Sequence, residues 1–533
     1  MLPSDLKLRP SNEGILLNDP DISMRFDIMP SLIRDLMEKR IILVRAPPFT
    51  GKTSLSQILE NNLVQSPEYS TYRIIRVSMI WGSAVGVKNC FESFGKLWKE
   101  IIGIDWMEWI GQCRYIKTVL ILDETQLIYK EAPVINEKDS VTADQFWTIV
   151  KGCLQELPNI FIIMFAAYGY KSSNCAGLST PIVLPSANYK SLVDINFTPD
   201  ELKKYVVRFC GKYLKKLKGS DISEFCEYIQ KVTEGHVGLV RHTLLRTEES
   251  MRKWTNQNDQ NQLTFQKIFT YLNSRSFNTS INEDCRAIPK VKSSSDKQND
   301  EQKKLKSLWG LCDLVYSNGM YPFNEHDKNA QYLVKTGVLV VVDSHLHFAA
   351  PLISRSFFLQ YYGSDERAEF APSSLYEFIV KIFRAMCEQS GEILRKNLGF
   401  GTDGNLLEQT WQKEFYRIGT QVLGWQHFLS CDVGAVFGCE GFVDFYVDQL
   451  DWAIELLRDG KDMAEHSRRF GPTGEYEEIM KYAKNVAIID IRSESKKVRN
   501  IKKDFIHVSY SKDYGKFKIE SLGKETVNIS FRN

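Results

Sequence analysis

The sequence predicts an α/β protein of several domains, and three observations support this fold class. Residues 41–195 alternate short, continuous apolar runs with longer mixed segments, as in a parallel sheet whose strands are covered by helices on both faces. From Thr198 onward the apolar residues recur at helical spacing. Near the C-terminus, strand-like segments return and carry acidic residues. With 533 residues, the chain is long enough for three or four domains.

The composition is that of an ordinary globular chain, 43% hydrophobic and 25% charged. The net charge of +2 gives no overall sign of nucleic acid or membrane binding, so any basic surface must be local. The 11 cysteines form no C-x-x-C pair, which favours reduced thiols in an intracellular compartment over disulfides or a zinc site. We find neither a signal-peptide core nor an apolar run of membrane-spanning length, so we expect an intracellular protein without a membrane segment.

A candidate phosphate-binding loop follows the first apolar run. "RIILVRA" is typical of a strand, and "SLSQILENNLV" behind the loop has helical spacing. Such a loop needs backbone N–H groups that point at an anion from a helix N-terminus, and Pro47 and Pro48 lack this group only early in the loop, where donors matter less. Gly51 allows close backbone approach, Lys52 can reach the β- and γ-phosphates, and the Thr53 hydroxyl can ligate Mg²⁺. The predicted nucleotide-binding loop comprises Ala46, Pro47, Pro48, Phe49, Thr50, Gly51, Lys52 and Thr53.

A second signal favours a nucleotide over a plain strand-to-helix loop that contains Gly-Lys-Thr. "TVLILDET" predicts a buried strand that ends in Asp123 and Glu124. Asp123 can hold Mg²⁺ through water, and Glu124 can polarise the attacking water. The chain has no Asn-Lys-x-Asp guanine motif, so ATP with Mg²⁺ is the expected cofactor. Arg241 is either a lid arginine near the γ-phosphate or an arginine on a helix surface.

The middle of the chain predicts helices and a small hairpin. Thr198 and Pro199 begin a helix with a cap-like residue and a proline at the first position. A polar stretch nearly free of large apolar residues predicts a flexible linker. Two helices and a hairpin around Asp343 and Ser344 then follow in the order of a winged helix. The predicted boundaries are 1–195 for a P-loop NTPase domain, 196–275 for a helical lid, 276–305 for the linker, 306–365 for the winged helix, 366–400 for a helical connector and 401–533 for the final domain.

A hairpin in the final domain places two acids opposite each other. "GFVDFYVDQLDWAIELLRDG" contains two strand-like segments, Val443–Val447 and Trp452–Leu457. If Gln449-Leu450 forms a two-residue turn, Asp444 faces Glu455 with Cβ atoms roughly 5 Å apart. The pair repels unless a hard divalent metal lies between the carboxylates, so without metal a Glu455→Gln change leaves stability unchanged or raises it. The alternative is a longer turn, which leaves one acid facing solvent.

An acid-bearing helix precedes this hairpin. "NLLEQTWQKEFYRIG" carries Glu408 and Glu414. A helix Glu, a strand Asp and a strand Glu, in this order, are typical of the restriction-endonuclease-like core, where carboxylates hold Mg²⁺ that activates water against a phosphodiester. We therefore predict a restriction-endonuclease-like α/β domain with Glu414, Asp444 and Glu455 as catalytic carboxylates and Glu408 as a weaker candidate. That core usually has lysine two residues after the strand Glu, where this chain has Leu457.

Other polar residues near the hairpin are weaker candidates. Arg458 alternates to the opposite face of its strand, and Lys461 has to reach back from beyond the turn. His466 is either a site residue or, more commonly, a surface histidine. The segment 492–503 packs six basic residues against one acid, which indicates a solvated face or, beside a nuclease-like site, contact with a phosphate backbone.

Five segments together resemble the Crinkler effector family of oomycetes and fungi: "APPFTGKTSL", "LILDE", "FAAYG", "EQTWQKEFYRIG" and "VDFYVDQLDWAIELLRDG…EHSRRF…GEY". The resemblance covers roughly residues 30–495, and the hairpin motif is its most specific part. It implies a P-loop NTPase module coupled to a restriction-endonuclease-like domain that acts on DNA. It also implies action in a host nucleus after secretion, with host nuclear proteins as candidate partners. By matching position, it implies nucleotide roles for Lys52, Thr53, Asp123 and Glu124, and nuclease roles for Glu414, Asp444 and Glu455.

Three functions remain open from the sequence. The first is an ATP-dependent nuclease acting on DNA, which the facing pair Asp444 and Glu455 favours. The second is an ATPase switch whose nuclease fold is inactive and serves as a docking module for nucleic acid or protein, which Leu457 favours. The third is a DNA-binding regulator that uses the winged helix, although its recognition helix, "EHDKNAQYLVK", is not strongly basic. Oligomerisation is compatible with each of them.

Overall fold

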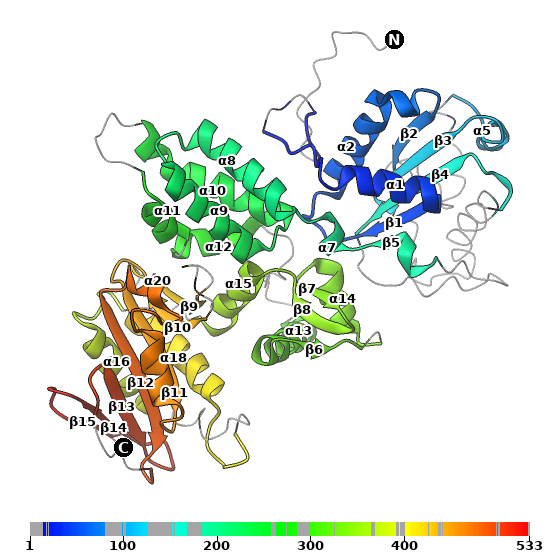
Figure 1. Ribbon diagram of the computed structural model, residues 1–533. Coiled ribbons are helices and arrows are strands. Elements are labelled where there is room, and N and C mark those ends of the chain that lie inside the picture. Colours follow the sequence, from blue (N-terminus) through cyan, green and yellow to red (C-terminus); the bar gives the residue numbers. More distant parts are fainter. Residues whose placement is uncertain are drawn as a thin grey trace. The chain divides into compact units, whose positions relative to one another are not determined.

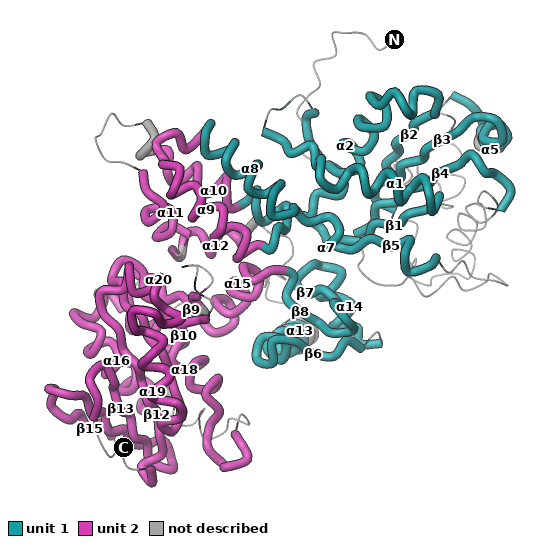
Figure 2. Tube along the Cα trace, in the orientation of Figure 1, with its two compact units in different colours: residues 1–212, 234–242, 285–349 teal, residues 213–233, 243–284, 350–533 magenta. Residues whose placement is uncertain are grey.

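The computed structural model (Figure 1) describes residues 14–530 apart from several stretches and single positions. Those left out are 80–98, 100–102, 126–151, 153–154, 168–183, 257–262, 285–297, 364–367, 391–393, 395–399, 435–436, 499–500 and residues 18, 20, 273, 325, 425, 438, 440 and 497. The chain divides into two compact units, coloured separately in Figure 2. Unit 1 comprises Met1–Lys212, Glu234–His242 and Cys285–Ala349, and unit 2 comprises Tyr213–Thr233, Thr243–Asp284 and Ala350–Asn533.

Five parallel strands form the main sheet of unit 1 in the order β2-β3-β4-β1-β5. All residues of β1 and β3 are buried, whereas β2 lies at the edge and is mostly half-buried. A parallel sheet with these helices matches a P-loop NTPase fold, which confirms that part of the predicted fold class. The strands are β1 (Ile41–Arg45), β2 (Arg73–Ser78), β3 (Thr118–Asp123), β4 (Ile160–Ala166) and β5 (Tyr189–Lys190).

Two helices pack on the strands of this sheet, and two loops leave it at the same edge. Helix α1 packs against β1 and β4, and α2 packs against β2, β3 and β4. Because the strands are parallel, the segments after β1 and after β3 leave the sheet at the same carboxyl edge, with β4 between them. The helices in this part are α1 (Met29–Lys39), α2 (Lys52–Gln65), α5 (Trp106–Gln112) and α7 (Leu192–Ile195).

The helices of the predicted lid are divided between the two compact units. Its first helix begins as expected, because Oγ1 of Thr198 accepts a hydrogen bond from the backbone N–H of Glu201 at 3.1 Å. However, α8 and the start of α10 belong mainly to unit 1, and the other helical segments belong to unit 2. The helices are α8 (Pro199–Tyr213), α9 (Gly219–Thr233), α10 (Val237–Asn256), α11 (Phe265–Leu272) and α12 (Arg275–Asp284).

Both ends of the predicted 276–305 linker are helical, so that prediction is wrong there. Helix α12 continues to Asp284, and α13 (Gln298–Asn318) begins at Gln298. Within α12, Phe277 and Ile281 are fully buried one helical turn apart. Their spacing stabilises the helix through packing, which the polar average composition concealed. Residues 285–297 lie outside the described part of the chain.

A three-stranded sheet in unit 1 has the predicted hairpin. Asp343 and Ser344 have φ values of 46° and 64°, which is the backbone of a type I′ turn between two strands. Helix α14 precedes the hairpin and ends at Gly337, whose φ is 83°. The prediction extended this domain to residue 365, but α15 (Pro351–Tyr362) belongs to unit 2. The other elements are β6 (Tyr321–Pro322), α14 (Lys328–Thr336), β7 (Leu339–Val342) and β8 (His345–Phe348), with sheet order β6-β8-β7.

A seven-stranded mixed sheet dominates unit 2, in the order β15-β14-β13-β12-β11-β10-β9. Strands β9, β10 and β11 form an antiparallel meander, and β12 and β13 run parallel to β11. Strand β14 is antiparallel to both of its neighbours, β13 and β15. The strands are β9 (Leu429–Val433), β10 (Val443–Val447), β11 (Trp452–Arg458), β12 (Asn485–Ser493), β13 (Phe505–Tyr510), β14 (Lys516–Ser521) and β15 (Val527–Ser530). The helices are α16 (Leu375–Ala385), α18 (Glu408–Val422), α19 (Met463–Arg469) and α20 (Glu477–Met480).

Aromatic packing sets the rotation of α18 on this sheet. Phe415 stacks on Phe445 of β10 with ring centroids 5.1 Å apart, and Trp411 lies 5.1 Å from Tyr510 of β13. Both Phe415 and Trp411 are almost fully buried. Since one face of α18 is committed to the core, the polar residues on its other faces have defined directions. Across the described part of the chain, we find no helix that combines the length and the apolar character needed to cross a membrane.

Candidate functional site

The predicted phosphate loop connects β1 to α2 at the carboxyl edge of the unit 1 sheet. Gly51 immediately precedes α2 with φ 78°, and Phe49 has φ 71°. Only glycine adopts such values without strain, so Phe49 is held by its surroundings. A Cβ atom added at Gly51 would lie 3.3 Å from Cγ1 of Val237, which makes this position tight as well as left-handed.

Lys52 lies inside the loop. The residue is only 8% exposed, and its Nζ donates to the carbonyl oxygen of Pro47 at 2.6 Å. Oγ1 of Thr50 donates to the same carbonyl at 2.8 Å. Burial lowers the pKa of Lys52 to about 8, although the negative charges of Glu124 and Asp123 act in the opposite direction. The lysine therefore carries a poorly solvated charge within reach of the acidic end of β3.

Thr53 and Asp123 meet across the sheet edge. Their side chains are hydrogen-bonded, and Oδ1 of Asp123 also accepts from the backbone N–H of Glu124 at 3.0 Å. Burial raises the pKa of Asp123, while these two hydrogen bonds and the charge of Lys52 oppose the shift. Glu124 has φ 56°, so the chain turns sharply where β3 ends. The structure thus brings together the four polar residues of the two predicted motifs, and their catalytic roles stay predictions.

The first turn of α10, which the sequence analysis did not single out, packs directly on the phosphate loop. A Cβ atom added at Gly238 would lie only 1.9 Å from the carbonyl oxygen of Phe49. His236 is 3% exposed, its ring lies 6.4 Å from that of Phe49, and its Nδ1 accepts from the backbone N–H of Leu239 at 3.4 Å. These contacts hold Phe49 in its left-handed conformation. The only sequence signal was a pair of glycines flanking a histidine and a valine before a helical run.

Arg241 lies on the surface of the same helix. Its side chain is exposed and hydrogen-bonded to Tyr205 of α8. Of the two roles that the sequence left open, this conformation corresponds to the helix-surface arginine.

We expect Gly238→Ala to lower ATP affinity at least tenfold, which corresponds to about 1.4 kcal/mol. The added methyl group cannot coexist with the carbonyl of Phe49, so the loop or the start of α10 must move. Gly211→Ala is the matched control, because nothing lies within 4 Å of a Cβ atom at this position of α8. Titration with a fluorescent ATP analogue measures both variants. Equal affinity of Gly238→Ala and the unchanged protein would show that α10 does not shape the loop.

We also expect the stability of unit 1 to fall in mild acid because of His236. Burial, helped by the charge of Lys52, lowers its pKa from 6.5 to about 4. Between these two values the unfolded chain binds the extra proton, so stability decreases as the pH falls from 6.5 to 4, by about 3 kcal/mol in total. His236→Asn keeps an acceptor at the helix start but cannot titrate, and should flatten this dependence. Amide hydrogen exchange in β1 between pH 7 and 4.5 measures it, and an unchanged slope in the variant would contradict the assignment.

The hairpin of unit 2 has the predicted register. Asp444 and Glu455 are the next pair beyond the last bonded pair of the ladder. The turn is longer than the two residues assumed, because 448–451 connect the strands and the N–H of Asp451 donates to the carbonyl oxygen of Val447 at 3.0 Å. This longer turn keeps the predicted register. The side chain of Asp444 is held by protein donors, because Oδ1 accepts from Nε2 of Gln412 at 2.7 Å and Oδ2 accepts from the backbone N–H of Leu456 at 2.5 Å. The paired residues are Phe445 with Ile454, Tyr446 with Ala453 and Val447 with Trp452.

Glu408, and not Glu414, is the helix acid near this pair, so the ranking of the two predicted acids is corrected. Gln412, which bonds Asp444, lies one turn from Glu408 on the same face of α18. Burial raises the pKa of Glu408, the nearby charge of Glu455 adds to the shift, and His466 opposes it. Glu414 is two residues, or about 200°, around the helix from Gln412 and pairs with Arg417 at 3.0 Å. The sequence pattern identified two acids on one helix, and the core contacts of the helix decide between them.

The carboxylate of Glu455 is surrounded by hydrogen-bond donors, one of which is the cation Arg469. The residue is 3% exposed, and its Oε1 lies 2.8 Å from Nδ1 of His466, 3.1 Å from the hydroxyl of Tyr476 and 3.4 Å from Nη1 of Arg469. Oε2 of Glu455 is buried without a hydrogen-bond partner among the described residues. Burial and the charge of Glu455 raise the pKa of Tyr476 far above its usual range, so its hydroxyl remains a donor. Because this charge compensates Arg469, we now expect that neutralising Glu455 lowers stability, in place of the unchanged or higher stability expected from the sequence.

The position where a lysine is expected after Glu455 is occupied by a leucine of the hydrophobic core. Leu457 is 1% exposed and packs against Ile488 and Phe505. Arg458 forms ion pairs with Asp403 and Asp459 and is not free to take over this role. Lys461 lies close enough for its charge to act on the pKa of Glu408, in the direction that lowers it. Among the predicted candidates, Lys461 is therefore the lysine whose charge acts near the acids, as that of the missing lysine would.

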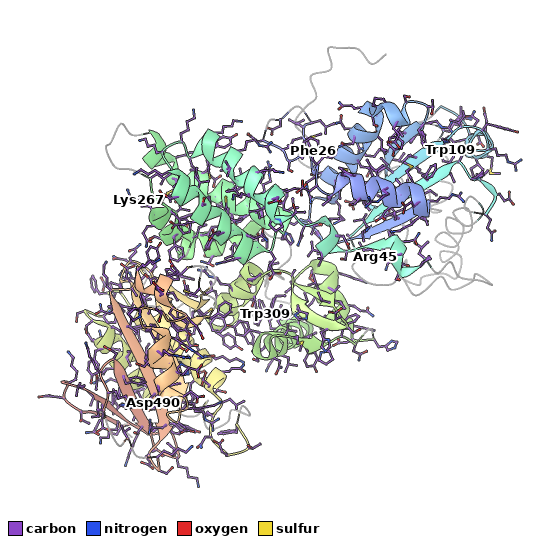
Figure 3. All side chains as sticks on the ribbon, viewed as in Figure 1. Phe26, Arg45, Trp109, Lys267, Trp309 and Asp490 are labelled. Atoms are coloured by element: carbon purple, nitrogen blue, oxygen red, sulfur yellow. The ribbon has the colours of Figure 1, made fainter. Side chains whose placement is uncertain are left out.

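The basic segment 492–503 is not a uniform basic face. Arg492 is mostly buried and pairs with Asp490 of the same strand, which is labelled in Figure 3. His507 completes this cluster, with Nδ1 2.8 Å from Oδ2 of Asp490. Lys496 pairs with Asp459 at 2.9 Å. Arg492 is therefore engaged inside the domain, whereas Lys496 is ion-paired but exposed, and positions 497, 499 and 500 lie outside the described residues.

The described side chains form no larger metal-binding cluster. Within the described part of the chain, no group of three or more histidine, cysteine, aspartate or glutamate side chains could hold a metal ion. Any cation at the hairpin would therefore depend on the pair Asp444 and Glu455, which the sequence predicted as metal ligands.

Comparisons with known proteins find similarity at the level of solved structures. The Walker-type ATPase PABY2304 of Pyrococcus abyssi is 14% identical at a TM-score of 0.37, over 66% of this chain and 98% of that one. The RuvB Holliday junction branch migration motor of Thermotoga maritima is 14% identical at a TM-score of 0.27, over 61% and 91%. AMPPCP-bound DnaA from Aquifex aeolicus is 14% identical at a TM-score of 0.28, over 57% and 86%. Neither a protein-family model nor a curated protein matches the chain.

Proposed function

We propose that the chain binds ATP together with Mg²⁺ and hydrolyses it in unit 1. The observation that carries this proposal is the convergence of Lys52, Thr53 and Asp123 at the end of the phosphate loop. Lys52 supplies a cation for the β- and γ-phosphates, and its buried charge favours an anionic partner. Thr53 and Asp123 are the residues that would hold Mg²⁺, and their direct hydrogen bond places both oxygens at one point. Glu124 orients the attacking water.

The C-terminal part of unit 2 is a restriction-endonuclease-like domain that acts on DNA. The order α18, β9, β10, β11, α19 and β12 supports this assignment, with an antiparallel meander followed by a crossover to a parallel strand. The site comprises Asp444 and Glu455, with Glu408 beside them. A buried carboxylate oxygen without a partner, Oε2 of Glu455, fits a divalent cation. Such a cation supplies Lewis acidity and lowers the pKa of a bound water.

The protein's own side chains set up this site. Gln412 and the N–H of Leu456 orient Asp444, and Lys461 adds a positive charge near Glu408. Helix α10 begins on the phosphate loop and continues into unit 2, which supports control of the C-terminal domain by the nucleotide state. This combination is the one that the Crinkler resemblance implies. DNA is the proposed partner, and action in a host nucleus stays a prediction.

A second candidate function is an ATPase switch with an inactive nuclease fold that docks nucleic acid or protein. The observation in its favour is Leu457, which fills the usual lysine position and is buried in the core. In this case, the cluster around Glu455 stabilises the domain and cleaves nothing.

Incubation of the full chain with supercoiled plasmid tests the proposal. We expect nicking or linearisation with Mg²⁺ or Mn²⁺ that depends on ATP and stops on chelation. Lys52→Ala should lose the cleavage that ATP stimulates, and Glu455→Gln should lose cleavage under all conditions. ATP turnover without cleavage under any metal condition would favour the second candidate function, and a chain that binds no ATP would contradict both.

A further inference from the structure

The hydrogen bonds that Glu455 accepts from the described residues all reach one of its two carboxylate oxygens. Three groups converge on Oε1: Nδ1 of His466, the hydroxyl of Tyr476 and Nη1 of Arg469. A carboxylate can only accept hydrogen bonds, so each of them is a donor. Oε2 has no partner among the described residues although it is fully buried. A buried oxygen without a donor costs free energy, and three donors on its neighbour do not relieve that cost.

Tyr476 and Arg469 each have further partners. Tyr476 is fully buried, and its ring packs 4.9 Å from that of Phe470. Its single hydroxyl proton is shared between two acceptors, the carbonyl oxygen of Phe442 at 2.7 Å, just before β10, and Oε1 of Glu455 at 3.1 Å. Arg469 also pairs with Glu465 at 3.0 Å and with Glu475 at 3.5 Å. The two donors come from segments after β11, and both contact Oε1 of Glu455.

We infer that Tyr476 and Arg469 are positioning residues that hold Glu455 by Oε1, so that Oε2 is presented to a divalent cation shared with Asp444. This inference rests on the proposed nuclease-like site. Neither Tyr476 nor Arg469 is a metal ligand in this inference. Each affects metal affinity because it holds the ligand Glu455 in place. Outer residues that orient a metal ligand typically change metal affinity 10- to 100-fold when they are lost.

A purely structural role predicts a different outcome. If the cluster serves only to neutralise Arg469, removing one donor lowers stability and leaves metal affinity unchanged. The chain offers a matched comparison, because Tyr446 on β10 is also buried and its hydroxyl donates to Oδ1 of Asp451 at 2.9 Å. Tyr446→Phe and Tyr476→Phe each remove one hydroxyl that donates to a carboxylate, and only the second hydroxyl reaches Glu455.

The test is calorimetric titration of the full chain with Mn²⁺. We expect Tyr476→Phe to weaken Mn²⁺ binding about tenfold, Tyr446→Phe to leave it unchanged, and Glu455→Gln to abolish it. If Glu455→Gln abolishes binding while Tyr476→Phe behaves as the unchanged protein, the positioning role is overturned and the proposed metal site stands.

If the unchanged protein binds no Mn²⁺, the metal site and the inference that rests on it are both overturned. A second measurement tests separately whether Tyr476 holds Glu455. Hydrogen exchange in β11 gives the opening equilibrium for Tyr476→Phe alone and in the Glu455→Gln background. We expect Tyr476→Phe to increase opening several-fold in the first background and much less in the second, because the shared hydrogen bond is then already weakened. Equal effects in both backgrounds would show that Tyr476 does not hold Glu455, and would overturn the inference.

Discussion

Lys52→Ala is expected to abolish ATP binding, with a loss of at least a hundredfold, or about 3 kcal/mol. The substitution removes the ammonium group that lies inside the phosphate loop, 2.6 Å from the carbonyl of Pro47. A phosphate group loses a charged donor in a poorly solvated place, where hydrogen bonds to ions are strongest. Equilibrium binding of a fluorescent ATP analogue measures the effect.

Unfolding does not explain such a loss. Burial lowers the pKa of Lys52 to about 8, which means that the folded, nucleotide-free protein carries this charge at a cost. Removing it should leave the nucleotide-free stability unchanged or higher. Glu124→Gln is the complementary variant, and should retain ATP affinity while losing turnover. An unchanged ATP affinity in Lys52→Ala would place the nucleotide elsewhere or exclude it.

Glu455→Gln is expected to destabilise the local structure around β11 by about 1–3 kcal/mol. The change removes a charge that is almost fully buried and that compensates Arg469. The same change should abolish Mn²⁺ binding, since it leaves one fewer carboxylate for the cation. Hydrogen exchange of the β11 amides reports the first effect and calorimetry the second, both on the full chain.

Glu465→Gln is the matched control for this prediction. Glu465 pairs with the same Arg469 at 3.0 Å, but its side chain is 46% exposed. A surface ion pair of this kind contributes about 0–1 kcal/mol, so this variant should hardly change exchange in β11 or Mn²⁺ affinity. Equal effects of the two substitutions would show that Glu455 has no special role beyond its charge.

The nucleotide-site candidates could be predicted because their signals are local. A strand, a loop with Gly51 and Lys52, and a helix are adjacent in the chain, and the acidic end of a second buried strand marks the other half. Parallel strands bring such ends to one edge of the sheet, so two short patterns predict one site. The contact between Gly238 and Phe49 could not be predicted in this way, because it joins segments almost 190 positions apart whose approach depends on how α10 packs.

The hairpin shows the same division within unit 2. The register of β10 and β11 follows from the centre of the turn and the period of two residues, and places Asp444 opposite Glu455. The two-residue periodicity of a strand does not predict which side chains from other elements contact these acids. Helix α19 supplies His466 and Arg469 one turn apart, Tyr476 comes from the segment behind it, and all three contact Oε1 of Glu455.

The sequence by itself determined the α/β class, the strands of the parallel sheet, the two motifs of the candidate nucleotide site and the pairing of the acidic hairpin. Each of these depends on residues close in the chain, on periodicity or on turn chemistry. Only the tertiary structure decided that Glu408 and not Glu414 faces the hairpin, that Leu457 is core, and that the predicted linker is helical at both ends. Those outcomes depend on which face of a helix or strand is buried against distant segments, and this is set by packing over the whole domain.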